Sequence, residues 1–360
     1  MIVLFSEAQS VDPGCGKRQR NAIALVTIRA SGLVTISAGQ NNTLVSATKP
    51  FGTYTYFYDV GVHWGFNQAS LVEGTRGEKT AAVPQRFSVS YGAMGVSVSV
   101  LASGSRGNCA LVATSATRVL VDAGLSGRET FKRLRALGER TEEISAILIT
   151  HEHSDHVAGL QRLAAKLNVP VFLTAPTHHA WNRTVRDEEG AIPELPKSEH
   201  FSAGRSFRVG DIEVMPFTIP HDAIDPVGFT FRAEGVKLGF ATDLGYMPAS
   251  VRNHLRGCTV LVIESNHDVE MLRAGPYPWS VKQRVMSRVG HLSNEALAEF
   301  FSSDYDGGAE YLVLAHLSEQ NNHPEKARVS AELALGRCTG LWHNRVLLAT
   351  QTQALESIRL

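Results

Sequence analysis

Three imidazoles and two carboxylates lie within six consecutive positions of the chain, His151-Glu-His-Ser-Asp-His156. Imidazole nitrogens and carboxylate oxygens are ligands for zinc, manganese and iron. Because His151 and His153 are two positions apart, their side chains point to the same side of an extended backbone. Asp155 and His156 follow and can face a second ion. This density of potential ligands predicts a metal centre, with a polar loop at a strand end as the alternative.

The segments on either side place this run on a loop between a strand and a helix. Residues 144–149 are mostly apolar, which predicts a buried strand. From Val157 to Leu167, apolar residues recur at helical spacing, which predicts a helix. Side chains on such a loop can converge on one point without competing with core packing.

Four other polar residues each follow a predicted apolar strand. One such residue alone is usually a satisfied core or loop residue. Four of them in succession, together with the main cluster, indicate a shared site. They are Asp122, His221, Asp243 and His316.

The H-x-H-x-D-H pattern, with these residues in this order, resembles the metallo-β-lactamase superfamily over residues 95–355. The resemblance implies an α/β (α+β) fold, a four-layer αββα sandwich that holds two divalent ions, zinc or manganese. Asp243 and a nucleophilic hydroxide would bridge the two ions. Asp122 would lie outside the ligand set and accept a hydrogen bond from a ligand imidazole or a loop amide. The implied ligands are His151, His153 and His221 for one ion and Asp155, His156 and His316 for the other.

The rest of residues 94–360 alternates strands with helices. Ser126 and Glu129 have the spacing of a capping box, which predicts a helix that stops at Gly138. Residues 205–219 predict a hairpin that turns at Gly210. Helices are also predicted for residues 250–255, 281–289, 294–301 and 324–335. Further strands are predicted for residues 96–101, 118–122, 171–174, 227–232, 236–242, 259–264, 311–315 and 346–350.

Three further motifs narrow the resemblance. They are Ser103-Gly-Ser-Arg-Gly-Asn108, Ser265-Asn-His-Asp268 leading to Gly275-Pro-Tyr-Pro-Trp279, and Gly290-His-Leu-Ser-Asn294. Together they resemble a bacterial subgroup, the YycJ (WalJ)-type proteins, which is related to phosphodiesterases and associated with 5′-exonuclease activity on DNA. The resemblance implies a dinuclear metal-dependent hydrolase that cleaves phosphodiester bonds in DNA or in a small phosphodiester.

Phosphodiester cleavage requires a proton for the leaving oxygen and neutralisation of phosphate charge. In the related phosphodiesterases a Glu and His pair donates this proton, and the resemblance points to Glu264 with His267, or with His291 as the competing candidate. Asp155 is expected to be catalytic as well as a ligand. Backbone amides of the Gly-rich loop, with Ser105 and Asn108, are predicted to approach a phosphate.

Lys282, Arg284 and Arg288 lie on one predicted helix and could follow a nucleic-acid backbone, but a solvated helix face is the favoured interpretation. Two other functions remain open. The same ions could hydrolyse a thioester or a lactam, as in glyoxalase II or β-lactamase relatives. A non-catalytic metal-binding regulator is the minor alternative.

Composition limits these choices. The chain has 360 residues, 43% hydrophobic and 19% charged, which is typical of a globular protein. No window holds the ~18 apolar residues that a membrane helix needs, and the N-terminus lacks the order of a secretory signal. Four widely separated cysteines predict reduced thiols and a cytoplasmic location. The balanced net charge means that any contact with nucleic acid must come from a local patch.

Residues 1–93 differ in character from the rest. They hold eight basic and five acidic residues, which leaves a net charge of −3 for residues 94–360. Residues 51–58 alternate like a strand, so one interpretation is a small β-rich appendage. The favoured interpretation is that Met94 is the true start and the upstream segment is an unstructured extension, because Val96 begins the first strand that the sandwich requires.

Overall fold

The computed structural model describes residues 22–30, 52–60, 95–185, 194–338 and 344–360. The chain divides into two compact units, Met1–Ala93 and Met94–Leu360. In the first unit, strands β1 (Ala22–Ala30) and β2 (Gly52–Val60) pair in antiparallel register. The alternating stretch of residues 51–58 overlaps β2. Most of the remaining calls on residues 1–93 lie outside the described residues, and the choice between an appendage and an extension stays a prediction.

A chain that starts at Met94 should fold, bind metal and keep full activity. All the predicted ligands lie within the second unit, and about 270 residues are ample for one such core. Solubility, metal content and kcat/KM of the shortened chain, compared with the full chain, test this. An insoluble or inactive product would show that residues 1–93 contribute to the fold.

Two seven-stranded sheets make up the second unit. Their strand orders are β16-β3-β4-β5-β6-β7-β8 and β15-β14-β13-β12-β11-β10-β9. Neighbouring strands are parallel from β5 to β8 and from β12 to β15, and antiparallel elsewhere. The first sheet consists of β16 (Ile358–Arg359), β3 (Ser97–Ala102), β4 (Cys109–Ala113), β5 (Arg118–Val121), β6 (Ala146–Leu148), β7 (Val171–Thr174) and β8 (Ser198–Phe201). The second consists of β15 (Arg345–Leu348), β14 (Tyr311–Ala315), β13 (Val260–Glu264), β12 (Val236–Ala241), β11 (Val227–Ala233), β10 (Ile212–Thr218) and β9 (Phe207–Val209).

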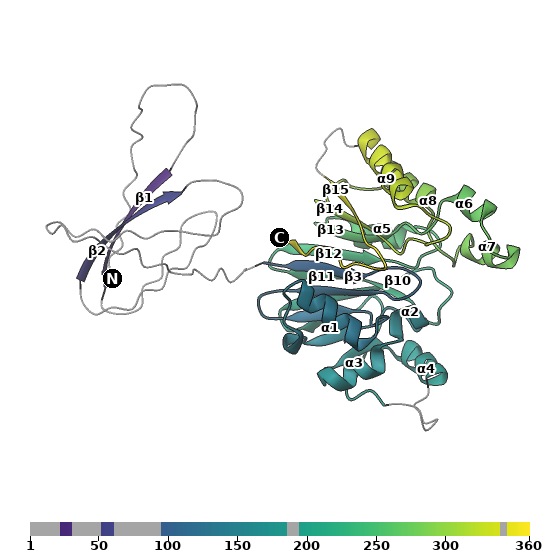
Figure 1. Ribbon diagram of the computed structural model, residues 1–360, viewed down its shortest axis with the longest axis horizontal. Coiled ribbons are helices and arrows are strands. Elements are labelled where there is room, and N and C mark those ends of the chain that lie inside the picture. Colours follow the sequence, from purple (N-terminus) through teal and green to yellow (C-terminus); the bar gives the residue numbers. More distant parts are fainter. Residues whose placement is uncertain (1–21, 31–51, 61–94, 186–193, 339–343) are drawn as a thin grey trace. The chain divides into compact units, whose positions relative to one another are not determined.

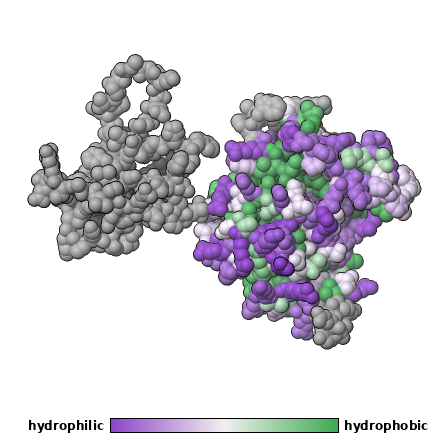
Figure 2. All heavy atoms as spheres, in the orientation of Figure 1, coloured by the Kyte–Doolittle hydropathy of each residue, from purple (hydrophilic) through white to green (hydrophobic). Residues whose placement is uncertain are grey.

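The sheets face each other across an apolar core, and helices cover their outer faces (Figure 1). Phe229 and Phe231 are fully buried between the sheets, and each contributes roughly 2–3 kcal/mol by leaving water. The surface of this unit is largely hydrophilic, with apolar residues scattered over it (Figure 2). The predicted four-layer αββα sandwich is confirmed. The first sheet is covered by α1 (Gly127–Ala136), α3 (Leu160–Leu167) and α4 (Ala175–Thr184), and the second by α5 (Ala249–Leu255), α8 (Asn294–Ser303) and α9 (Pro324–Cys338).

Local sequence signals account for several element boundaries. Ser126 Oγ accepts a hydrogen bond from Glu129 N at 3.3 Å and caps α1, and Gly138 follows its end with φ of +78°. The helix predicted for residues 281–289 corresponds to α7, which begins two residues earlier and ends four residues earlier, at Trp279–Val285. Helix α4 was not predicted, although Thr174 caps it and a proline lies in its first turn.

Among the described residues, no helix combines the length and the apolar character needed to cross a membrane.

Candidate metal centre

The predicted site residues converge at one edge of the sandwich because they follow strands that end there. The carboxyl ends of parallel strands meet at the same edge of a sheet. Asp122 follows β5 and the His151 run follows β6, while Asp243 and His316 follow β12 and β14 of the other sheet. The edge between the two sheets therefore collects side chains from distant parts of the chain.

Three of these strand-end residues have left-handed backbone conformations. The φ angles are +63° at Asp122, +61° at Asp243 and +55° at His316. Such a conformation costs a residue other than glycine on the order of 1 kcal/mol or more and is concentrated at functional sites. Each residue thereby turns its side chain out of the strand and toward the shared edge.

One group of potential ligands consists of His151, His153 and His221, whose donor atoms all lie within 4.8 Å of one another. His221 Nε2 lies 3.2 Å from His153 Nδ1. The other ring nitrogen of His221 donates to Gly290 O at 3.1 Å, which orients the imidazole. His151 is fully buried at the base of this group.

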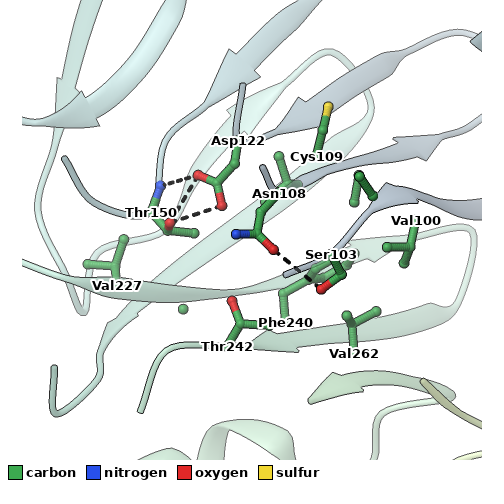
Figure 3. Close-up of a pocket in the computed structure, with 14 residues that line it drawn as sticks. Val100, Ser103, Asn108, Cys109, Asp122, Thr150, Val227, Phe240, Thr242 and Val262 are labelled. Atoms are coloured by element: carbon green, nitrogen blue, oxygen red, sulfur yellow. Dashed lines mark hydrogen bonds between the residues drawn. The ribbon is translucent and has the colours of Figure 1, made fainter. Parts of the chain in front are cut away.

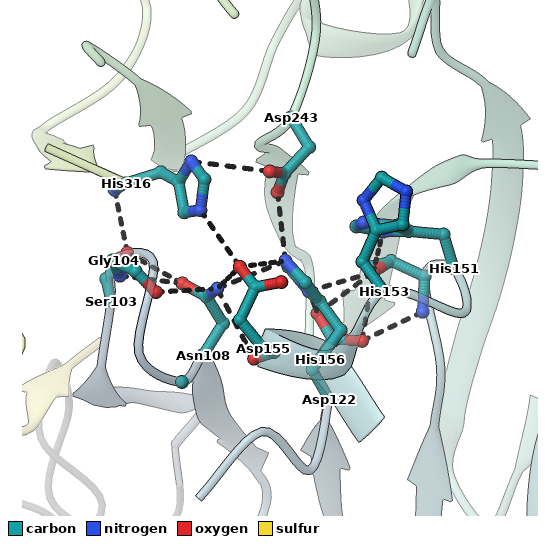
Figure 4. Close-up of polar contacts among 12 residues, drawn as sticks. Ser103, Gly104, Asn108, Asp122, His151, His153, Asp155, His156, Asp243 and His316 are labelled. Carbon is teal, nitrogen blue, oxygen red and sulfur yellow. Dashed lines mark hydrogen bonds and ion pairs between the residues drawn. The ribbon is translucent and has the colours of Figure 1, made fainter. Parts of the chain in front are cut away.

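A second group consists of Asp155, His156 and His316, and Asp243 lies between the two groups (Figure 4). Asp155 Oδ2 is 3.3 Å from His316 Nε2 and 3.4 Å from His156 Nε2. Asp243 contacts His316 Nδ1 and His156 Nε2, each at 3.3 Å, through its two carboxylate oxygens. His151 also groups with His156 and Asp243, so the two sets overlap.

The electrostatics of the cluster favour a bound cation. Burial lowers the pKa of His151 well below its ordinary value, and the neighbouring imidazoles lower it further, so this ring is neutral and free to act as a ligand. Burial would raise the pKa of the Asp155 carboxyl, but His156 and His316 hold it well below its ordinary value. Burial would lower the pKa of His156, but Asp122, Asp243 and Asp155 raise it well above.

Two buried atoms test whether a metal ion fits here. His151 Nε2 and Asp243 Oδ2 have no hydrogen-bond partner within the described part of the chain, although both atoms are inaccessible to solvent. His156 Nε2 lies near Asp243 Oδ2 but does not hydrogen-bond to it. Unsatisfied buried polar atoms are costly, and both atoms belong to one group of candidate ligands. A divalent cation would satisfy both, so the residues fit the group that the sequence predicts.

Asp122 hydrogen-bonds to Thr150 and contacts His156, and so holds both residues in position. Its Oδ1 accepts hydrogen bonds from Thr150 N and Thr150 Oγ1, both at 2.9 Å (Figure 3). Its Oδ2 is 2.7 Å from His156 Nδ1 (Figure 4). This geometry leaves His156 Nε2 facing the site. A cavity of about 30 Å³, large enough for about one water molecule, lies beside these residues between the sheets. Thr150, which also contacts His151 Nδ1 at 3.0 Å, was not singled out from the sequence.

Two residues of the Gly-rich loop, Asn108 and Ser103, hydrogen-bond to the candidate metal ligands Asp155 and His316. Asn108 Nδ2 donates to Gly104 O and to Asp155 Oδ2, each at 3.1 Å, and Asn108 N donates to Asp155 O at 2.7 Å. The Ser103 hydroxyl accepts from His316 N at 2.7 Å. Asn108 therefore holds Asp155 in position, and its predicted contact with a phosphate stays a prediction. Ser105 is exposed, and its contact with a phosphate stays a prediction.

Glu264 pairs with His291 and not with His267. Glu264 Oε1 lies 2.8 Å from His291 Nδ1 and 3.0 Å from His316 Nδ1, and Oε2 accepts from two backbone amides. The side chain of His291 is 21% exposed, whereas Glu264 is fully buried. His267 points elsewhere, with Nδ1 3.3 Å from Asn266 Oδ1. Asn266, which was not predicted, donates to His316 O at 2.8 Å.

The prediction that three cations share one exposed helix face was wrong for the positions of two of them, Lys282 and Arg288. Lys282 is buried, and its Nζ donates to Arg273 O. Arg288 lies beyond the end of α7 and places its guanidinium 4.0 Å from the ring centroid of Tyr246. Arg284 is exposed and forms an ion pair with Asp222, next to His221.

A groove of about 620 Å³ opens beside the first ligand group. Its lining includes His153 and Gln161 on one side and Trp181 and Arg183 of α4 on the other. The cluster is therefore accessible from the surface through His153, although His151 is fully buried.

The fold and the site define a metallo-β-lactamase-type hydrolase. The family model described as "Beta-lactamase superfamily domain" matches residues 117–317, and the chain belongs to this family. The chain is 42% identical over 244 residues to Exodeoxyribonuclease YycJ of Bacillus anthracis, which covers 67% of the chain and 90% of that protein. It is 36% identical over 237 residues to Exodeoxyribonuclease WalJ of Streptococcus pneumoniae D39, over 66% of the chain and 87% of that protein.

Solved structures agree on the fold. The metallo-β-lactamase fold protein YhfI of Bacillus subtilis matches with a TM-score of 0.53 and 15% identity, over 72% of the chain and 99% of that protein. The predicted resemblance to the superfamily and to the YycJ (WalJ)-type subgroup is confirmed by the family match and by the identities to these relatives.

Proposed function

We propose that residues 94–360 form a metal-dependent hydrolase that cleaves phosphodiester bonds in DNA as a 5′-exonuclease. The observation that carries this proposal is the Glu264–His291 pair, which lies within reach of the candidate ligands Asp243 and His316. The exodeoxyribonuclease names of the two bacterial relatives support the substrate class. The cytoplasmic location and the 5′ polarity remain predictions.

The proposed division of ligands follows two of the four groups of donor atoms, and Asp243 belongs to the other two. His151, His153 and His221 would hold one ion, and Asp155, His156 and His316 the other, with Asp243 shared. Two divalent ions, zinc or manganese, would supply a nucleophile at neutral pH and neutralise phosphate charge. Asp122 and Asn108 keep His156 and Asp155 oriented.

His291 is the proposed proton donor for the leaving oxygen. Burial would lower the pKa of its imidazole, but the Glu264 carboxylate raises it above the ordinary value. The imidazolium is thus favoured and its ring reaches the accessible side of the cluster, where a leaving oxygen would lie. A thioester hydrolase has no need of this acid, because a thiolate leaves without a proton, so the pair favours phosphodiester cleavage over thioester hydrolysis.

The test compares substrate classes on the metal-loaded protein. With Mn²⁺ or Zn²⁺ bound, we expect cleavage of bis(p-nitrophenyl) phosphate and degradation of a 5′-labelled duplex, and metal analysis should return two ions per chain. The ratio of kcat/KM for a phosphodiester to that for a glutathione thioester should exceed one. Turnover of the thioester alone would establish the rival hydrolase. A protein with both ions bound that cleaves no substrate would support the non-catalytic regulator.

A further inference from the structure

Residues 269–291, here called the arm, contain α6 (Val269–Ala274) and α7 (Figure 1). The arm ends at His291, which lies among the candidate ligands. The arm holds four Lys or Arg residues and one Glu, a net charge of +3, whereas residues 94–360 as a whole carry −3. A local positive patch of this kind attracts a polyanionic backbone. Charge therefore favours nucleic acid as the partner of this surface.

The arm contacts two loops that carry candidate ligands, the loop of His221 and the loop after Asp243. Gly290 O accepts the hydrogen bond from His221, and Arg284 pairs with Asp222 on the same loop. On the loop after Asp243, a Cβ on Gly245 would lie 2.4 Å from the carbonyl carbon of Arg288, so only glycine permits this approach. A strand bound to the arm would thus lead directly to the metal centre.

Arg288 is the cation of the arm that is available to a phosphate. It is exposed and forms no ion pair with a carboxylate in the described part of the chain. Its guanidinium lies over Tyr246, which restricts its orientation while leaving the charge unneutralised. Arg284 and Arg273, by contrast, are paired with Asp222 and Glu270.

Trp279 provides an exposed aromatic surface on the same arm. Its side chain is 61% exposed, and three of the six exposed large apolar residues in the described ranges belong to the arm. Helix α7 is about 10 Å long, with Trp279 at its first position and Arg284 near its last. The buried Lys282, bonded to Arg273 O, fixes α7 against the end of α6. The exposed Trp279 and Arg288, which has no ion pair within the described ranges, therefore belong to one short segment whose helix is fixed in place.

We propose that the arm binds a single-stranded end of DNA, with a base stacked on Trp279 and a phosphate held by Arg288. This inference rests on the proposed function and adds the surface that receives the strand. Stacking on an aromatic side chain accepts every base, as an exonuclease that degrades any sequence requires. The combination of stacking and a cation is typical of surfaces that bind single strands without sequence preference.

Binding to the metal-loaded protein is tested with a fluorescein-labelled phosphorothioate oligothymidylate, which resists cleavage. Trp279→Ala should weaken binding about tenfold, and Trp279→Phe should retain most of it. Leu333→Ala, at a residue 59% exposed on α9, is the matched control and should leave the affinity unchanged. Arg288→Ala should reduce the slope of log K against log salt by about 0.7, the value for one phosphate contact. Arg208→Ala, on the exposed part of β9, should leave that slope unchanged.

The kinetic readout is the ratio of kcat/KM for DNA with a 5′ overhang to kcat/KM for bis(p-nitrophenyl) phosphate. Trp279→Ala should lower this ratio about tenfold, because only DNA reaches the arm. If the wild-type protein cleaves neither substrate, the proposed function fails while the binding measurement still decides the role of the arm.

Three outcomes would overturn the role of the arm. In the first, Trp279→Ala binds the oligonucleotide within twofold of the wild type. In the second, Leu333→Ala loses as much affinity as Trp279→Ala. In the third, Trp279→Ala alters self-association in light scattering without a change in DNA binding, which would identify the arm as a surface for another protein.

Discussion

Asp155→Ala should lower kcat on any phosphodiester on the order of a thousandfold and reduce the bound metal. Asp155 is the one carboxylate in the run His151–His156 that contacts both His156 and His316, and it is accessible at the surface of the cluster. Its removal takes a negative charge and a ligand atom from one ion site. The fold should survive, because Asp155 lies in the short helix α2 (Ser154–Val157) and not in the apolar core.

Asp155→Asn shows whether the charge of the Asp155 side chain or its shape is responsible for the loss. It keeps the volume of the side chain but removes the charge, so its metal content and kcat should fall nearly as far as those of Asp155→Ala. Glu332→Ala, which removes a partly exposed carboxylate paired with Arg328 on α9, is the control and should match the wild type. Circular dichroism checks the fold. If Asp155→Ala binds two ions and keeps its activity, the proposed division of ligands is wrong.

His291→Gln should lower kcat on DNA by about 10²- to 10⁴-fold, the usual contribution of a positioned general acid. Its effect on bis(p-nitrophenyl) phosphate should be much smaller, because p-nitrophenolate leaves without needing a proton. The physical reason is the position of His291, which contacts Glu264 at 2.8 Å and is the accessible member of the pair. The measurement is kcat for both substrates at saturating metal.

His267→Gln is the matched comparison. Burial lowers the pKa of His267 to about 4, so the ring is neutral near pH 7, and it is 2% exposed. It lacks both the proton and the access that a donor needs, and we expect kcat on DNA within a few-fold of the wild type. A larger loss for His267→Gln than for His291→Gln would contradict the assignment. An equal loss on both substrates for His291→Gln would indicate a role in holding the site together.

The ligand-rich loop could be identified from the sequence because its chemistry is local. Five polar side chains within six positions need only a strand before them and a helix after them to converge, and both were visible in the apolar pattern. The capping box at Ser126 and the turn at Gly210 are local in the same sense. The αββα class followed from the resemblance, and the two facing sheets confirm it.

The partner of Glu264 could not be read from the sequence, where His267 is three positions away and His291 is twenty-seven away. Proximity in sequence favoured His267, but the chain leaves the site after β13, forms the arm and returns at Gly290. That return is fixed by tertiary contacts with His221 and Gly245, which no local pattern encodes. For the same reason Lys282 and Arg288, expected on one exposed helix face, have different environments.

The sequence by itself determined the kinds of ligand and the order in which they occur, since these depend on residue type and strand alternation. Only the tertiary structure decided which donor atoms meet. Left-handed backbone at Asp122, Asp243 and His316 turns three distant strand ends toward one edge. Asn108 contacts Asp155, across 47 residues of chain, because the turn between the antiparallel strands β3 and β4 lies at the same sheet edge as the loop after β6. Such contacts depend on the packing of both sheets, and packing is a property of the whole domain rather than of any segment.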